Sequence, residues 1–157
     1  MPQHFHLSDT DTALPLQEAC LSQLLDSFRP QSSGSILRKL TSRAFGEPSD
    51  TTILPPVILC IGTDRLIGDS LGPLVGTRLQ YADNFTLPVY GTLDFPIHAL
   101  NLKDAMRSIK YFHPYNPIIA IDASLGARRH QHYITVSHGS LCPGSGVDKK
   151  LMEVGDI

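Results

Sequence analysis

The sequence predicts a layered α/β fold with a mostly parallel sheet, and three observations support this. Two continuous apolar runs, at 57–61 and 117–121, are typical of strands that are covered on both faces. A glycine-rich turn follows the first run and leads into a helical pattern. Strand and helix patterns then alternate between residues 56 and 122, which favours parallel strands joined by crossover helices.

Residues 1–50 are predicted to form a helical lead and a linker ahead of this domain. We expect residues 1–14 to be irregular. An amphipathic helix is predicted between Pro15 and Pro30, because apolar residues recur there at steps of four. A loop, a short basic helix and a second loop are expected at 31–35, 36–46 and 47–52.

The domain at 51–157 is predicted to contain four strands and two helices. Each strand prediction rests on an apolar run or on partial alternation, and each helix prediction rests on apolar residues at helical spacing. The expected strands are 56–61, 87–94, 116–122 and 132–139, and the expected helices are 69–81 and one within 95–113.

Composition limits the class of protein. The chain has 157 residues, 41% of them hydrophobic, which is enough for one domain with a packed core. A net charge of -2 gives no electrostatic reason to expect nucleic acid or an anionic membrane as a partner. The apolar runs are too short to span a bilayer, and the polar N-terminus is no secretory signal. Three cysteines without CxxC spacing predict a reducing, cytoplasmic location, and no cofactor is expected.

The stretch CIGTDRLIGDSLGPLVG, residues 60–76, does not match the known nucleotide loops. Its glycines, at 62, 68, 72 and 76, do not have the GxGxxG spacing. A P-loop is excluded too, because Asp69 stands where a lysine would attract phosphate. One interpretation is structural: Asp69 caps the following helix, and Gly72 and Gly76 let one helix face approach the sheet closely.

Three acids follow three predicted strands. Asp69, Asp94 and Asp122 come after the first, second and third strands, so they are expected at one edge of a parallel sheet, where ligands bind. Burial of Asp122 at the rim of the core, together with a second carboxylate, would raise its pKa. Two acids that share a proton can activate a water for attack on an amide. With a histidine, the same acids could instead hold a divalent metal. A turn cap is the structural alternative for Asp122.

Four sequence blocks, taken in order, resemble the small YyaC-type spore proteases. These are relatives of the germination protease that degrades small acid-soluble spore proteins. The blocks are IGTDRLIGDSLGPLVG, VYGTLDFPIHALNL, IIAIDASLG and PGSGVDKKLMEVGDI, and the resemblance covers about residues 53–157. A more distant similarity is to the hydrogenase maturation endopeptidases of the HybD type.

The resemblance implies a three-layer α/β/α sandwich of the phosphorylase/hydrolase-like class, as in HybD. It also implies an endopeptidase of atypical aspartic type with Asp69 and Asp122 as the catalytic pair. The implied partner is a protein substrate, with small acid-soluble spore proteins as candidates, and the implied location is the forespore or spore core. Members of the family run on beyond the VGD block with a further strand and helix, so an exposed sheet edge or a missing layer is expected here.

Two rival functions stay open from the sequence. The first is a metal-dependent maturation endopeptidase that recognises nickel and uses Asp69, Asp122 and His138, with His98 as the other candidate histidine. The second is a non-catalytic module that binds protein on the same fold. A cysteine nucleophile at Cys142 is a weaker possibility, since it would need His138 as its partner.

Four residues are predicted to bind substrate rather than to perform chemistry. Asp94 and His98 lie at or after the second strand, although His98 also suits a hydrogen-bonding role at a helix start. Gly144 and Gly146 belong to the CPGSGV turn, which could offer N–H groups to an oxyanion or could be a plain tight turn.

Overall fold

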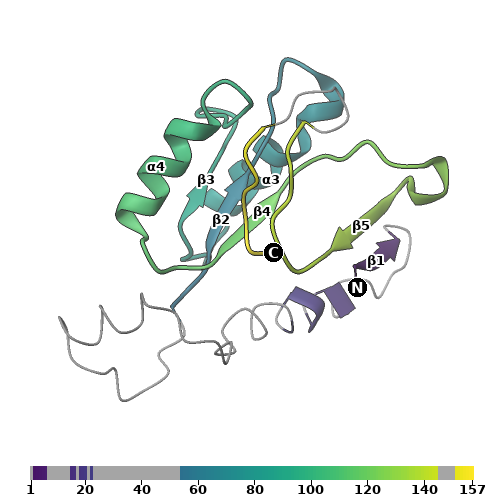
Figure 1. The fold of residues 1–157 in the computed structure, drawn as a ribbon, viewed down its shortest axis with the longest axis horizontal. Coiled ribbons are helices and arrows are strands. Elements are labelled where there is room, and N and C mark those ends of the chain that lie inside the picture. The colour runs from purple at the N-terminus through teal and green to yellow at the C-terminus, as the bar shows by residue number, and fades with distance from the viewer. Residues whose placement is uncertain (1, 7–14, 17, 21, 23–53, 145–150) are drawn as a thin grey trace.

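The structure is a computed structural model, and it describes residues 2–6, 15, 16, 18–20, 22, 54–144 and 151–157 (Figure 1). The helix predicted at 36–46 and its flanking loops lie outside the described residues. So do the second half of the helix predicted after Pro15 and residue Gly146. No helix in the described part of the chain is long and apolar enough to cross a membrane.

A three-stranded parallel sheet forms the centre of the molecule. Its order is β3 (Val89–Tyr90), β2 (Val57–Cys60) and β4 (Ile118–Ile121). All four side chains of β2 are buried, which confirms the prediction that both of its faces are covered. The α/β class with a parallel sheet is therefore confirmed. The second predicted strand is much shorter than expected, because the chain leaves the sheet after Tyr90.

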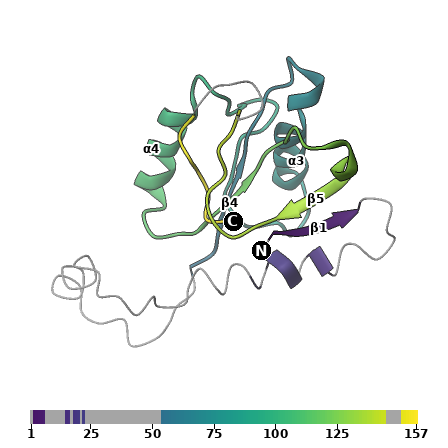
Figure 2. The ribbon, with the colours of Figure 1, turned by 45° about the vertical axis from the view of Figure 1, so that its right-hand side comes forward.

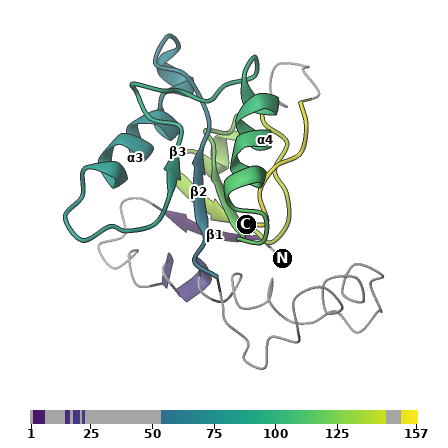
Figure 3. The same cartoon turned by 90° about the vertical axis from the view of Figure 1, so that its left-hand side faces the viewer.

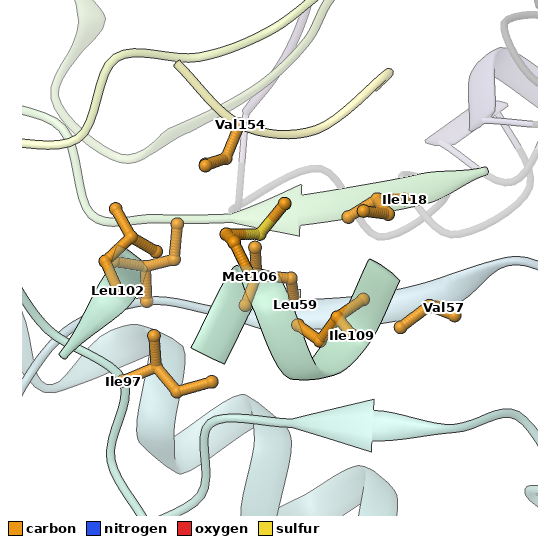
Figure 4. Packing of buried hydrophobic residues seen from close by; sticks show 9 residues of the cluster. Val57, Leu59, Ile97, Leu102, Met106, Ile109, Ile118 and Val154 are labelled. Carbon is orange, nitrogen blue, oxygen red and sulfur yellow. The ribbon is translucent and has the colours of Figure 1, made fainter. Parts of the chain in front are cut away.

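Two helices cover the sheet, one on each face. They are α3 (Leu71–Gln80) and α4 (Leu102–Phe112), and Figures 2 and 3 show them on opposite sides of the strands. A stripe on α4 is buried, formed by Leu102, Met106 and Ile109 at helical spacing. This stripe packs against the sheet residues of the main core, among them Val57, Leu59 and Ile118 (Figure 4).

Two glycines bring α3 into close contact with the other face. A Cβ at Gly72 would lie 2.0 Å from the carbonyl oxygen of Ile61, and one at Gly76 would lie 2.1 Å from the carbonyl oxygen of Gly91. No side chain can be accommodated at such distances. The predicted role of Gly72 and Gly76 in helix approach is therefore confirmed.

The fourth predicted strand forms, but it does not join the parallel sheet. It is β5 (Tyr133–Val136), which pairs antiparallel with β1 (Gln3–His6) in a separate sheet. The expectation of an irregular lead at 1–14 was therefore wrong for β1. The described residues between 15 and 22 are helical, as predicted, and Ala19 packs with Val136 and Ile157.

The last residues of the chain cover one edge of the parallel sheet. The N–H of Asp156 donates to the carbonyl of Ile118, and the N–H of Ala120 donates to the carbonyl of Ile157, both at 2.8 Å. The Asp156 carboxylate also accepts a hydrogen bond from the N–H of Ile118, at 2.9 Å. An exposed sheet edge therefore does not occur beside β4. At the other edge of the sheet, no described strand pairs with β3 on its far side.

Candidate active site at the carboxyl edge of the sheet

Asp69 is held above the carboxyl end of β2 by its own backbone. Its N–H donates to the carbonyl of Leu66, and its carbonyl accepts from the N–H of Thr63, both at 2.9 Å. Gly62 has φ +141°, and a Cβ there would lie 2.0 Å from the carbonyl oxygen of Asp69. Gly62 therefore lets the loop fold back onto the end of the strand, and this close contact fixes the position of the Asp69 backbone.

Asp69 does not cap the helix, which corrects the structural interpretation. It ends a short 3-10 turn, η1 (Ile67–Asp69), and α3 starts at Leu71, two residues later than predicted. The N-cap residue is Ser70, whose side chain makes no capping bond. Its hydroxyl donates instead to the carbonyl of Ile67, at 2.9 Å. The half-buried carboxylate of Asp69 therefore has no capping role at the start of α3.

Asp122 follows β4 directly, and its surroundings change its acidity. Burial, and after it the negative charge of Asp69, together raise the pKa of this half-buried carboxyl to about 6. A hydrogen bond from the backbone N–H of Ala123 lowers the pKa in part. Because β2 and β4 are neighbours in the sheet, the two acids stand at adjacent strand ends. The predicted meeting of Asp69 and Asp122 is thus supported by the electrostatic effect of one on the other.

We expect Asp122→Asn to stabilise the folded protein above pH 7. The pKa of folded Asp122 lies above its ordinary value, so the folded protein binds more protons than the unfolded chain between about pH 4 and pH 6. Stability therefore falls as the pH rises through this window. Removing the charge should add about 1 kcal/mol at pH 8, since a half-buried carboxyl is partly screened by solvent, and little at pH 4.

Urea denaturation at the two pH values measures this difference. Asp83→Asn, which neutralises an exposed acid in a turn, is the control, and its effect on the free energy of unfolding should be the same at both pH values. An equal gain for Asp122→Asn at pH 4 and pH 8 would contradict the raised pKa.

Asp94 and His98 follow β3 in the chain. Asp94 is exposed in a turn closed by Thr92, whose hydroxyl accepts from the N–H of Phe95 at 3.2 Å. The N–H of Leu100 donates to His98 Nδ1 at 3.3 Å, as in the predicted helix-start role. Both residues line a pocket of about 560 Å³ along β3. The prediction that Asp94 contributes to the same edge as the pair stays a prediction.

The other predicted residues are His138, Gly144, Gly146 and Cys142. His138 is exposed, and the described residues contain no group of three or more His, Cys, Asp or Glu that could hold a metal ion. His138 therefore does not join Asp69 and Asp122 in such a group. Gly144 has φ +69°, which fits a tight turn, while Gly146 is not among the described residues. The thiol of Cys142 lies 3.5 Å from the carbonyl oxygen of Leu151.

Two groups that shape the site were not predicted from the sequence. Gly62 was counted among the glycines, but its contact with the Asp69 backbone was not foreseen. The N–H of Ala123 is a main-chain group and leaves no trace in residue identity. A small residue directly after the strand-end acid is the only signal for it, and that signal is weak.

The fold and site define an α/β protein that carries a carboxylate pair at the carboxyl edge of its parallel sheet. Sequence comparison then gives the family. The chain belongs to the family described as "Protein of unknown function (DUF1256)", whose family model matches residues 35–157. This match begins well before the domain boundary predicted at residue 51.

A curated relative supports the YyaC-type resemblance. The chain is 48% identical over 103 residues to "Uncharacterized protein YyaC" of Bacillus subtilis (strain 168). The alignment covers 66% of this chain and 50% of that protein, so the chain spans about half the length of the curated relative. No solved structure matches the chain.

Proposed function

We propose that this protein is an endopeptidase that hydrolyses peptide bonds with the pair Asp69 and Asp122. One observation carries the proposal: the pKa of Asp122 is raised to about 6, by burial and by Asp69, at adjacent ends of parallel strands. A carboxyl group with a raised pKa beside a second carboxyl group is a common arrangement for general acid–base catalysis. The resemblance to YyaC-type spore proteases, relatives of the germination protease, points to the same two residues.

The chemistry divides between the acids according to their surroundings. Near pH 6, Asp122 holds a proton and Asp69 acts as the base. Asp69 takes a proton from a water whose oxygen attacks the amide carbon, while Asp122 gives its proton to the carbonyl oxygen. In the second step Asp69 protonates the leaving nitrogen as the C–N bond breaks. One hydroxyl of the tetrahedral intermediate returns its proton to Asp122. A carboxylic acid and an amine leave, and both aspartates regain their starting states.

Finer aspects of the proposal rest on the resemblance. The two helices on opposite faces suit the three-layer phosphorylase/hydrolase-like sandwich of HybD-type proteins. Small acid-soluble spore proteins are the candidate substrates, and the forespore or spore core is the candidate location. Asp94 and His98 are proposed to contact the substrate from the β3 pocket, and the loop that holds Gly144 and Gly146 is proposed to line the site.

Incubation of the protein with a small acid-soluble spore protein tests the proposal. We expect new fragments in the mass spectrum, formed at the same rate with and without EDTA. The rate should fall as the pH rises through about 6, because Asp122 then loses the proton that it must donate.

Different results would favour the rival functions. Loss of cleavage in EDTA, with recovery on addition of a divalent metal, would point to a metal-dependent enzyme of the HybD type. Binding of the spore protein without any cleavage between pH 5 and pH 8 would point to a non-catalytic module.

A further inference from the structure

The two edges of the parallel sheet are treated differently by the chain. The edge at β4 is covered by Asp156 and Ile157, which bond to Ile118 and Ala120 through their backbone. The edge at β3 has no described strand beside it. The same edge opens into the pocket of about 560 Å³, which is lined by β3 itself. An unpaired strand that faces a pocket is a ready site for another extended segment.

The pairing register shows which backbone groups face this pocket. Ile58 is paired with Val89, and the N–H of Ile58 donates to the carbonyl of Pro88 at 2.9 Å. In a parallel pair, a residue bonds to the two neighbours of the residue opposite it. The groups of β3 that face β2 therefore belong to Pro88 and Tyr90. The N–H and carbonyl of Val89 point to the open side.

The walls of the pocket are held in place before any ligand arrives. The hydroxyl of Tyr90 and Nε2 of His113 lie 3.0 Å apart, at hydrogen-bond distance. The N–H of Leu93 donates to the hydroxyl of Thr77, at 2.9 Å, which ties the loop after β3 to α3. A groove that is already ordered loses less entropy when it binds a segment.

The lining also indicates the chemistry of the ligand. Phe95 is 80% exposed, although it is a large aromatic residue at the rim of the pocket. Asp94 is the one aspartate, glutamate, lysine or arginine among the lining residues. The lining therefore suits a bulky apolar side chain next to a lysine or arginine.

We propose that the open edge of β3 binds the polypeptide substrate as an added strand, with a bulky apolar residue against Phe95 and a basic residue against Asp94. This inference rests on the proposed function, because it gives the substrate a path toward the carboxyl edge where Asp69 and Asp122 stand. The backbone of Val89 supplies the strand pairing, and the pocket selects the side chains.

Binding to a peptide library tests the proposal without any need for cleavage. The protein is the full chain with Asp122→Asn. The probes are capped, fluorescein-labelled nonapeptides with Phe, Ser or Glu at position five and Lys, Ser or Glu at position six. Fluorescence anisotropy should show the tightest binding for the Phe–Lys peptide. Absence of binding by every peptide at about 1 mM, which is the weak end of measurable affinity, overturns the proposal.

Two substitutions and one change in the peptide locate the binding. Val89→Pro removes the open-side N–H and leaves the bonds to β2, so affinity should fall about fivefold, as for one lost hydrogen bond. Phe95→Ala should weaken binding about tenfold. Tyr111→Ala is the control, because Tyr111 is equally exposed, at 80%, but lies on α4 away from the pocket. N-methylation of single peptide bonds tests strand pairing even if Val89→Pro does not fold.

The outcomes separate this inference from the proposed function. Unchanged affinity in both variants overturns the strand addition, even if the wild-type chain cleaves peptides. Binding that these changes weaken supports it, even if the wild-type chain never cleaves. A dimer in sedimentation that Val89→Pro abolishes would show that a second copy occupies the edge, and would also overturn the proposal.

Discussion

Asp122→Asn is expected to lower the rate of peptide cleavage at least about 1,000-fold while the protein stays folded. Asn keeps the size of the side chain but cannot donate the proton that the carbonyl oxygen needs. General acid–base groups contribute about 100- to 10,000-fold to enzymatic rates, and this acid is proposed to act in both steps. Burial and the nearby charge of Asp69 raise the pKa of Asp122 to about 6, so this carboxyl can still carry a proton near that pH.

Asp69→Asn should lose a similar factor, because the attacking water then has no base. The double variant should be little slower than either single variant, since two groups that act as one unit do not contribute additively. Single-turnover rates at pH 5.5 measure these effects, with thermal unfolding as the check on folding. Asp83→Asn, at an exposed turn, should cleave at the wild-type rate. Normal cleavage by either Asp69→Asn or Asp122→Asn would end the proposal of an aspartate pair.

The sequence was most informative where local pattern and burial agree. The run at β2 is apolar at every position. This pattern is typical of a strand that is covered on both faces, and all four side chains are buried. The α4 stripe was equally clear, because Leu102, Met106 and Ile109 repeat at helical spacing. Strand-end acids followed from topology: once the strands are parallel, Asp69 and Asp122 must share an edge.

The sequence was least informative where pairing is made between distant segments. β1 reads QHFH, a mostly polar stretch, yet His4 and Phe5 pair with Thr135 and Ile134 across the sheet. Those contacts depend on residues about 130 positions away, so no local window could predict them. The cover over β4 is similar, because the Asp156 carboxylate reaches the N–H of Ile118.

The second predicted strand shows how a turn can shorten a strand. The run LPVYGTLD predicts a strand that ends at residue 94. The strand stops at Tyr90, because Thr92 bonds to Phe95 through both its backbone and its hydroxyl and closes a turn. The chain rejoins the sheet only at Ile97, which pairs with Ile61. Competition between a threonine-based turn and strand pairing is decided by tertiary contacts.

Gly72→Ala is expected to destabilise the protein by about 3 kcal/mol, against the usual rule for helices. In an exposed helix, Ala is more stable than Gly by up to about 1 kcal/mol. Here the added methyl would lie 2.0 Å from the carbonyl oxygen of Ile61 and 2.7 Å from its carbonyl carbon. Strand backbone cannot move away without breaking the sheet, so α3 must shift outward and lose its contacts.

Gly68→Ala is the matched control within the same glycine-rich stretch. Nothing lies within 4 Å of a Cβ at Gly68, so its free energy of unfolding should change by no more than about 0.5 kcal/mol. Urea denaturation of the two variants separates glycines that pack from glycines that only bend the chain. If Gly72→Ala were as stable as wild type, the close approach of α3 would be wrong. The placement of Asp69 would then lose its support, because the same approach holds the loop that carries this acid above β2.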